Sequence, residues 1–229
     1  MNHIFLDFEM NLCGRDQEPV DPACPNEIIE IGAVILNQDL EQKGVYKKYV
    51  KPVRCPLIHE SIVSLTGITD EAVADAPQLL EAMLDFEKWC RSFGKDYEVF
   101  AWSENDLRQV REELASKALN HEGKLDYMFD NWHDFQDEFR HMLGYRNPIA
   151  LNRAVDMTEQ NFEGRQHDAC DDALNTARLY IQAHTSDEFM AKLSGIKDAM
   201  KPYKPATFTL GDMLKSKLAQ LNITEEDDK

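Results

Sequence analysis

The stretch HIFLDFEMN, residues 3–11, combines the composition of a buried strand with two carboxylates. Successive side chains of a β-strand point to opposite faces, so Asp7 and Glu9 share one face and lie roughly 6.6 Å apart along the strand. The other face carries the apolar side chains of Leu6, Phe8 and Met10. Two ionised carboxylates at this separation repel each other unless a cation lies between them. The pair is therefore either a solvated strand end or part of a cation site.

The size and composition of the chain are those of an ordinary globular protein. Its 229 residues suffice for one large domain or two small ones, and 43% are hydrophobic and 29% charged. No apolar run approaches the roughly 18 residues that span a membrane, and the N-terminus lacks the pattern of a secretory signal peptide. Five cysteines form no C-x-x-C pair, which indicates reduced thiols. These features predict a cytoplasmic protein with no membrane partner.

The formal net charge of −17 limits the kinds of partner that the chain can bind. Basic residues that contact phosphates supply most of the affinity for duplex nucleic acid, so an acidic chain argues against broad duplex binding. The charge does not exclude an enzyme that grips a few nucleotides through bound metal ions. Part of the excess lies in the tail TEEDDK, residues 224–229, which we expect to be solvated.

Hydrophobic periodicity predicts a single α/β domain with a mixed sheet flanked by helices. Strands are expected at 3–11, 27–37, 43–52 and 97–102, with a weak strand near 127–132. Helices are expected at 77–93, 104–119, 133–143, 149–157, 170–184 and 186–200. The polar segment 11–26 is expected to be a loop, and 201–216 a tail packed irregularly on the body.

The segment GRQHDACDDALNTARLYIQ, residues 164–182, places two neighbouring acids on different faces of a predicted helix. At 100° per residue, Asp171 falls on a polar stripe with Asn175, Arg178 and Gln182. Asp172 falls instead at the edge of the apolar side, with Thr176, Leu179 and Ala183. An acid directed toward the protein is rarely tolerated unless it is paired or bound to a cation. We therefore expect a solvated Asp171, which tolerates replacement by Asn, and an inward-facing Asp172.

Asp106 and His167 complete a set of candidate site residues. Taken alone, Asp106 fits the first turn of a helix, where the helix dipole stabilises an acid, and His167 fits a cap or a surface position. Together with Asp7, Glu9 and Asp172, they supply what a two-magnesium phosphodiesterase needs. Magnesium takes carboxylate and phosphate oxygens, and two ions about 4 Å apart stabilise the attacking and leaving oxygens of an in-line displacement. A neutral histidine can remove the proton from the attacking water.

The motifs DFE at 7–9, END at 104–106 and HDACDD at 167–172 resemble the DEDDh family of 3′–5′ exonucleases, which have a ribonuclease-H-like fold. SLTGITDEAVADAPQLLEA, residues 64–82, is similar to the substrate-side segment of that family. The motif pattern is closest to the Eri-type RNA exonucleases and similar small bacterial exonucleases. The resemblance implies an exonuclease domain at 1–185, followed at 186–229 by a C-terminal helix and tail that are packed on the domain or partly disordered.

The resemblance also implies a role for each candidate residue. It makes His167, five residues before Asp172, the general base, and it assigns the ligands of two Mg²⁺, with Mn²⁺ also accepted, to Asp7, Glu9, Asp106 and Asp172. The terminal nucleotide is expected to contact the residues beside the motifs, which are Met10, Leu65, Thr66 and Trp102. Stacking of a base on an apolar or aromatic surface is worth ~1 to 3 kcal/mol, although Leu65 and Trp102 fit ordinary core positions equally well.

The implied reaction is hydrolysis of single-stranded nucleic acid from a free 3′ end to nucleoside 5′-monophosphates, with RNA or short oligonucleotides favoured. A ribonuclease-H-like endonuclease with the same acids is an alternative that has no need of His167. A regulatory or binding protein that retains the fold without catalysis is a second alternative. Loss of one ligand would mark such a protein, but all five positions are intact in this sequence.

Overall fold

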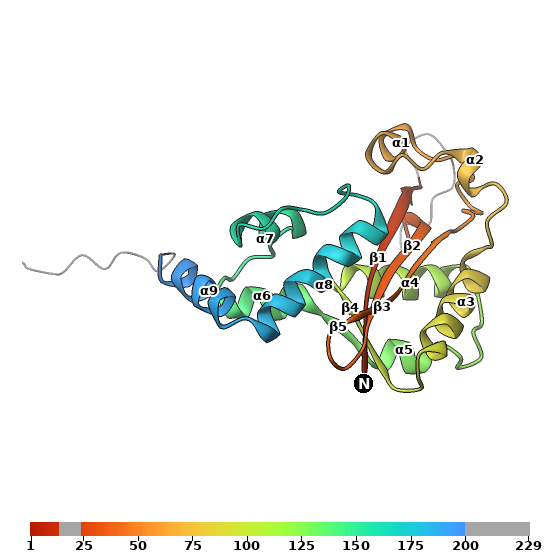
Figure 1. Cartoon of the computed structure of the whole chain (residues 1–229). Coiled ribbons are helices and arrows are strands. Elements are labelled where there is room, and N and C mark those ends of the chain that lie inside the picture. Colours follow the sequence, from red (N-terminus) through yellow and green to blue (C-terminus); the bar gives the residue numbers. More distant parts are fainter. Residues whose placement is uncertain (14–23, 200–229) are drawn as a thin grey trace, which may run out of the picture.

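A computed structural model describes residues 1–13 and 24–199 of the chain. Within these residues, one mixed sheet has the strand order β3-β2-β1-β4-β5. Its strands are β1 (Asn2–Leu12), β2 (Asn26–Leu36), β3 (Gln42–Tyr49), β4 (Tyr97–Ala101) and β5 (Trp132–Asp134). The central strand β1 pairs antiparallel with β2 and parallel with β4 (Figure 1). This mixed sheet between helices confirms the predicted fold class.

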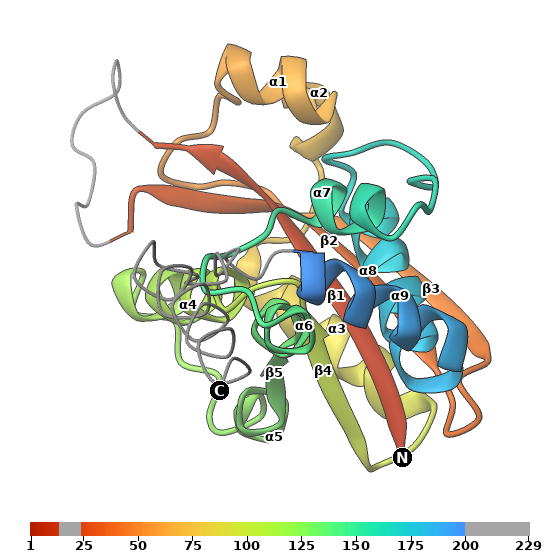
Figure 2. The ribbon, with the colours of Figure 1, turned by 90° about the vertical axis from the view of Figure 1, so that its left-hand side faces the viewer.

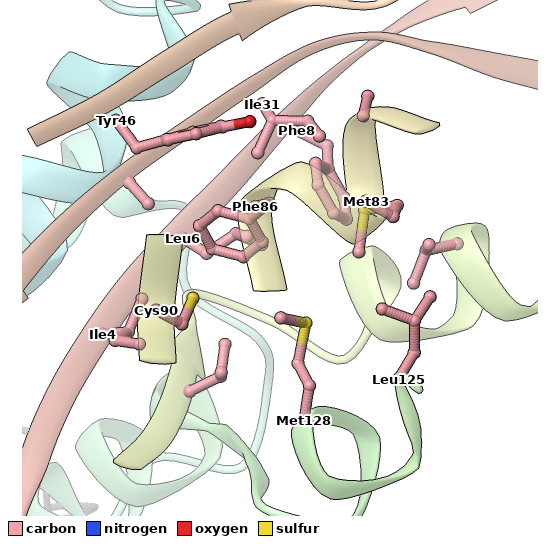
Figure 3. Packing of buried hydrophobic residues seen from close by; sticks show 14 of the residues in the cluster. Ile4, Leu6, Phe8, Ile31, Tyr46, Met83, Phe86, Cys90, Leu125 and Met128 are labelled. Carbon is pink, nitrogen blue, oxygen red and sulfur yellow. The ribbon is translucent and has the colours of Figure 1, made fainter. Parts of the chain in front are cut away.

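Helices cover both faces of the sheet, which explains why apolar residues on both faces of β1 and β2 are buried. One face packs against α3 (Leu79–Ser92), α4 (Asn105–Ser116) and α5 (Asp126–Asp130). Figure 3 shows Leu6 and Phe8 of β1 in this core beside Met83 and Phe86 of α3. The opposite face, which includes Phe5, packs against α6 (Phe135–Leu143), α7 (Leu151–Met157), α8 (Ala169–Thr185) and α9 (Asp187–Ala199).

A third apolar cluster attaches two short helices, α1 (Glu60–Thr66) and α2 (Asp70–Val73), to the sheet. Ile29 of β2 belongs to this cluster, and its other buried members are Ile58, Ile62, Ile68 and Val73. The pairing of β1 with β2 shifts register between Glu9 and Met10, so Ile29 has no partner in the ladder. Figure 2 shows α1 and α2 at the end of the sheet where β1 finishes. Because the register shifts directly after Glu9, the bulge lies beside the acids of β1.

The structure corrects the sequence-based element boundaries at two places. The segment 127–132, predicted as a weak strand, is mostly the helix α5, and β5 begins only at Trp132. The helices α1 and α2 were not predicted as helices at all. Helix α9 packs on α6 and α8 through the buried Phe189 and Leu193. The predicted irregular tail and most of the predicted 11–26 loop lie outside the described residues, and the boundary at 185 stays a prediction.

Two negative expectations concern cysteines and membranes. All five cysteines are free thiols, as their spacing predicted. Across residues 1–13 and 24–199, no helix has the length and apolar character needed to cross a bilayer. The cytoplasmic location stays a prediction.

Candidate active site

Asp7 and Glu9 project from β1 toward helix α8 and not into open solvent. They pair in register with Gly32 and Glu30 of β2, and α8 packs across both strands. Glu9 is only 7% exposed. The strand alternation therefore places both carboxylates on the same face, as predicted, and the alternative of a solvated strand end is excluded.

Asp106 reaches the same place from the neighbouring strand. Because β4 runs parallel to β1, the two strands end at the same edge of the sheet, and α4 begins there. The carboxylate of Asp106 lies in the first turn of α4 and is 6% exposed. It accepts a hydrogen bond of 3.2 Å from the backbone N–H of Phe8, the residue between the two acids of β1. The structure thus brings a third carboxylate to the pair.

Helix α8 and the turn before it bring the fourth acid and the histidine. Ligand atoms of Glu9, His167 and Asp172 all lie within 4.8 Å of one another. The carboxylate of Asp172 also accepts a hydrogen bond of 3.2 Å from the backbone N–H of His167. His167 has a φ of 63°, a left-handed conformation that costs a non-glycine residue roughly 1 to 3 kcal/mol. Contacts around the turn before α8 must therefore impose this conformation.

The four carboxyl groups are poorly solvated and surround one another, and both effects disfavour their ionised forms. Burial raises the pKa of Glu9 to about 8, and the charge of Asp172 adds to this shift. Burial likewise raises the pKa values of Asp106 and Asp172 to about 7. The pKa of Asp7 lies well above its usual value, through burial first and then through the charges of Asp106 and Asp172. A cation bound among these groups would favour their ionised forms and so lower their pKa values.

The donor set fits a hard divalent cation. It consists of carboxylate oxygens that come from three separate elements, with one imidazole beside them. Carboxylate oxygens are the protein ligands that magnesium and manganese prefer. The raised pKa values reflect burial and the repulsion among the ionised carboxylates, and a bound cation would relieve this repulsion. Asp7, Glu9, Asp106 and Asp172 are therefore the residues that could hold it.

A second cluster of possible ligands, formed by Cys13, Glu27 and Cys55, has a different character. The carboxylate of Glu27 already accepts a hydrogen bond of 2.7 Å from the backbone N–H of Cys55 and forms an ion pair with Lys117. Backbone N–H groups of Val53 and Arg54 also donate to it. These donors lower the pKa of Glu27 even though it is buried. This carboxylate is satisfied without a metal ion.

Three charged residues that sequence inspection missed anchor the start of α8. Lys47 Nζ lies 3.2 Å from a carboxylate oxygen of Glu30 and 2.5 Å from one of Asp168. Glu30 is 1% exposed and also accepts a hydrogen bond from the backbone N–H of Ala169. The side chain of Asp168 caps α8. The signal that was overlooked is Glu30 itself, a single acid inside the apolar strand EIIEIGAVILN.

A glycine allows α8 to approach the sheet closely. Gly32 faces Asp7 in the β1–β2 ladder. A Cβ at this position would lie 2.1 Å from the carbonyl carbon of Ala169 and 2.2 Å from the backbone nitrogen of Cys170. Only a residue without a side chain leaves room for the first turn of α8, which brings Asp172 over the acids of β1.

Three of the predicted nucleotide-binding residues differ in their exposure and contacts. Leu65 on α1 is 46% exposed, whereas Thr66 is buried and its hydroxyl donates to the carbonyl of Ile62. Met10 lines a cleft of about 540 Å³ with Asn105 and other residues of α4. Leu65 therefore offers the open apolar surface, and Thr66 supports the end of α1.

Trp102 lies in the core, and this is one of the two positions that the sequence left open for it. Its side chain is 7% exposed and packs against Phe135 and Phe139. The indole Nε1–H donates a hydrogen bond of 2.8 Å to the carbonyl of Ile149. The expected stacking surface is thus buried in the core, because Trp102 follows β4 on the side that α6 covers.

The structure also corrects the environment of the polar stripe on α8. Asp172 points toward the acids of β1, as the helical wheel predicted. Asp171 is not simply solvated, because its carboxylate accepts a hydrogen bond of 2.7 Å from the backbone N–H of Arg165. Asn175, on the same stripe, is only 1% exposed. The loop before α8 covers this face of the helix.

Known proteins are similar to most of this chain in sequence. ERI1 exoribonuclease 2 of Xenopus laevis is 26% identical over 196 residues, which cover 77% of this chain and 27% of that protein. The human 3′-5′ exoribonuclease 1 is 26% identical over 189 residues, which cover 77% of this chain and 50% of that protein. This chain thus spans between about a quarter and a half of the length of these relatives.

Solved structures share the fold. The nuclease domain of 3′hExo, described as a DEDDh family member bound to rAMP, matches with a TM-score of 0.66 at 22% identity and covers 81% of this chain and 92% of that one. Product-bound exonuclease I matches with a TM-score of 0.59 at 14% identity and covers 85% of this chain and 46% of that one. The likeness confirms the ribonuclease-H-like fold that the resemblance implied.

The family itself follows from a match over most of the sequence. A family model described as Exonuclease matches residues 4–180, a span that contains all five candidate residues of the site. The motifs DFE, END and HDACDD fall within it. The chain therefore belongs to the exonuclease family.

Proposed function

We propose that this chain is a metal-dependent 3′–5′ exonuclease that degrades single-stranded RNA or short oligonucleotides to nucleoside 5′-monophosphates. The observation that carries the proposal is the meeting of Asp7, Glu9, Asp106 and Asp172 with His167 at one edge of the sheet. The names of the relatives support the direction and the substrate class, since two of them are called exoribonucleases. A structural neighbour is described as a 3′-exonuclease in 3′-end specific recognition of a histone mRNA stem-loop.

Each residue of the site has a separate task in this proposal. The four carboxylates would hold two divalent ions, and these would supply positive charge that stabilises the attacking and leaving oxygens of the phosphodiester. His167 in its neutral form accepts the proton of the attacking water. The carboxylate of Asp172 accepts the backbone N–H of His167 and so keeps the histidine beside the acids. The exposed side chain of Leu65 offers an apolar surface to the terminal base.

The reaction is tested with linear and circular single strands of the same sequence. With magnesium or manganese present, the linear strand is expected to shorten stepwise from its 3′ end, and the circular strand to stay intact. Matched RNA and DNA strands measure the preference for RNA. Cleavage of the circle would favour the endonuclease alternative, and binding without any cleavage would favour the non-catalytic one. Activity that survives exhaustive removal of divalent metal would contradict the proposal.

A further inference from the structure

The loop that ends at His167 is bound to the polar stripe of α8. The Asn175 side chain accepts a hydrogen bond of 2.9 Å from the backbone N–H of Glu163 and donates one of 2.8 Å to the carbonyl of the same residue. One turn closer to the site, Asp171 accepts the N–H of Arg165 at 2.7 Å. One turn farther, Arg178 donates to the carbonyl of Asn161 at 3.1 Å. Three consecutive positions of the stripe thus hold the loop through its backbone.

The packing between loop and helix is close. A Cβ at Gly164 would lie 2.2 Å from the carboxyl group of Asp171, and Gly164 has a φ of +76°. Asn175 is 1% exposed, so its amide is satisfied by protein and not by water. A buried amide with all these partners is costly to replace, because removing it leaves backbone groups without hydrogen bonds. The contacts therefore fix one conformation of the loop.

The same loop also reaches the opposite wall of the site. The guanidinium group of Arg165 donates a hydrogen bond of 3.1 Å to the carbonyl of Leu65 at the end of α1. Its Nη1 would lie 2.8 Å from a Cβ at Gly67, so the guanidinium lies directly against this turn. Two residues later, His167 has the left-handed backbone that the loop must impose. The loop thus connects Asp171 and Asn175 on α8 with Leu65 on α1, where the terminal base is proposed to bind.

We propose that Asp171 and Asn175 are positioning residues, which act on the reaction by fixing the loop that holds the His167 imidazole beside Glu9 and Asp172. This inference rests on the proposed role of His167 as the general base. A misplacement of about 1 Å can cost on the order of 10²-fold in rate, so loss of the loop contacts is expected to lower kcat without removing any metal ligand.

The first test compares four variants by kcat and KM. Asp171→Ala and Asn175→Ala are expected to lower kcat roughly 10- to 100-fold with little change in KM. Asp171→Asn keeps an oxygen that can accept the Arg165 N–H, so it is expected to restore most of kcat. Gln182→Ala is the matched control, because Gln182 is exposed on the same stripe beyond the loop contacts, and it is expected to behave as the wild type. Equal kcat for Asp171→Ala and wild type would overturn the inference.

The second test separates this inference from the proposed function. If Asp171 acts through His167, Asp171→Ala should have no further effect on kcat in a His167→Ala background. Multiplicative losses would overturn the positioning role, whereas a nearly normal single variant His167→Ala would overturn the general-base proposal itself. Magnesium binding, followed by calorimetry, is expected to be preserved in Asp171→Ala. Loss of binding would mean that the residue acts on the metal site.

Discussion

His167 is the residue whose replacement has the sharpest expected outcome. His167→Ala leaves the four carboxylates in place, so magnesium and substrate binding are expected to persist. Removal of a general base is expected to lower the rate by roughly 10²- to 10⁴-fold. Single-turnover kinetics at saturating enzyme measure the chemical step directly. A variant with nearly normal turnover would show that the histidine has only a structural role in the turn before α8.

Asp172 is expected to combine a large catalytic effect with an unusual effect on stability. Asp172→Asn removes the charge of a proposed metal ligand, so magnesium-dependent turnover is expected to be nearly abolished. It also removes one charge from a group of mutually repelling carboxylates. The melting temperature without metal is expected to rise, because the remaining acids repel less. Asp156→Asn on the exposed side of α7 is the control and should change neither quantity. Normal turnover of Asp172→Asn would require another acid to take its place in the site.

Local periodicity predicted side-chain directions at the residue scale but not what covers them. The alternation of β1 gave the shared face of Asp7 and Glu9, and the wheel of α8 gave the inward direction of Asp172. The wheel could not show that the 161–165 loop folds back over Asp171, because that contact depends on chain outside the helix. For Trp102, proximity to the END motif in sequence did not reveal the direction of the ring, which α6 covers.

At the scale of elements, the placement of α8 depends on Gly32. Gly32→Ala would put a methyl group 2.1 Å from the backbone of Ala169, so the first turn of α8 has to move. Overpacking of this kind costs roughly 1 to 3 kcal/mol, and the displacement of Asp172 is expected to lower kcat on the order of 10²-fold.

Gly195→Ala in α9 is the matched control, because among residues 1–13 and 24–199 no atom beyond the surrounding helix backbone lies within 4 Å of the added Cβ. It is expected to raise stability by about 1 kcal/mol, as Ala is a better helix former, and to leave kcat unchanged. Denaturant unfolding and steady-state kinetics on both variants measure the two effects. Normal activity of Gly32→Ala would show that α8 does not need its close approach to the sheet.

Elements with a strong period were predictable, and short ones were not. The long helices α3, α4 and α8 carry apolar residues at helical spacing, so their positions follow from sequence. Helices α1 and α2 have only seven and four residues, too few for a period to emerge. The aromatic run at 127–132 favoured a strand by composition, but Met128 and Phe129 pack into the core from one turn of helix. Tertiary packing, and not local composition, therefore determines the conformation of this segment.

For the whole molecule, the acidic site makes stability depend on pH and on metal. The pKa values of Glu9, Asp106 and Asp172 in the folded state, about 8, 7 and 7, exceed the values near 4 expected for the unfolded chain. At pH values between the unfolded-state and the folded-state pKa values, the folded protein binds more protons than the unfolded chain. The contribution of these three carboxyl groups to stability without metal is therefore greatest at low pH and is lost as the pH rises through their folded pKa values.

Thermal melts between about pH 5 and about pH 8 test this dependence. Without divalent ions, the melting temperature is expected to fall over this range, and magnesium should restore it most strongly at the upper end. Glu9→Gln is expected to flatten the metal-free slope and to weaken the effect of magnesium. A slope that is the same in wild type and Glu9→Gln would show that the site does not cause the pH dependence.

The proposed 3′–5′ exonuclease activity is tested by identifying the first product released from a 3′-end-labelled single-stranded RNA. In the presence of magnesium, the label is expected to appear from the earliest times as a nucleoside 5′-monophosphate. The same sample treated with a chelator, and the Asp172→Asn variant with magnesium, should release none. Early appearance of the label in longer fragments, or in a product with a 3′-phosphate, would contradict a 3′–5′ exonuclease built from these four acids and His167.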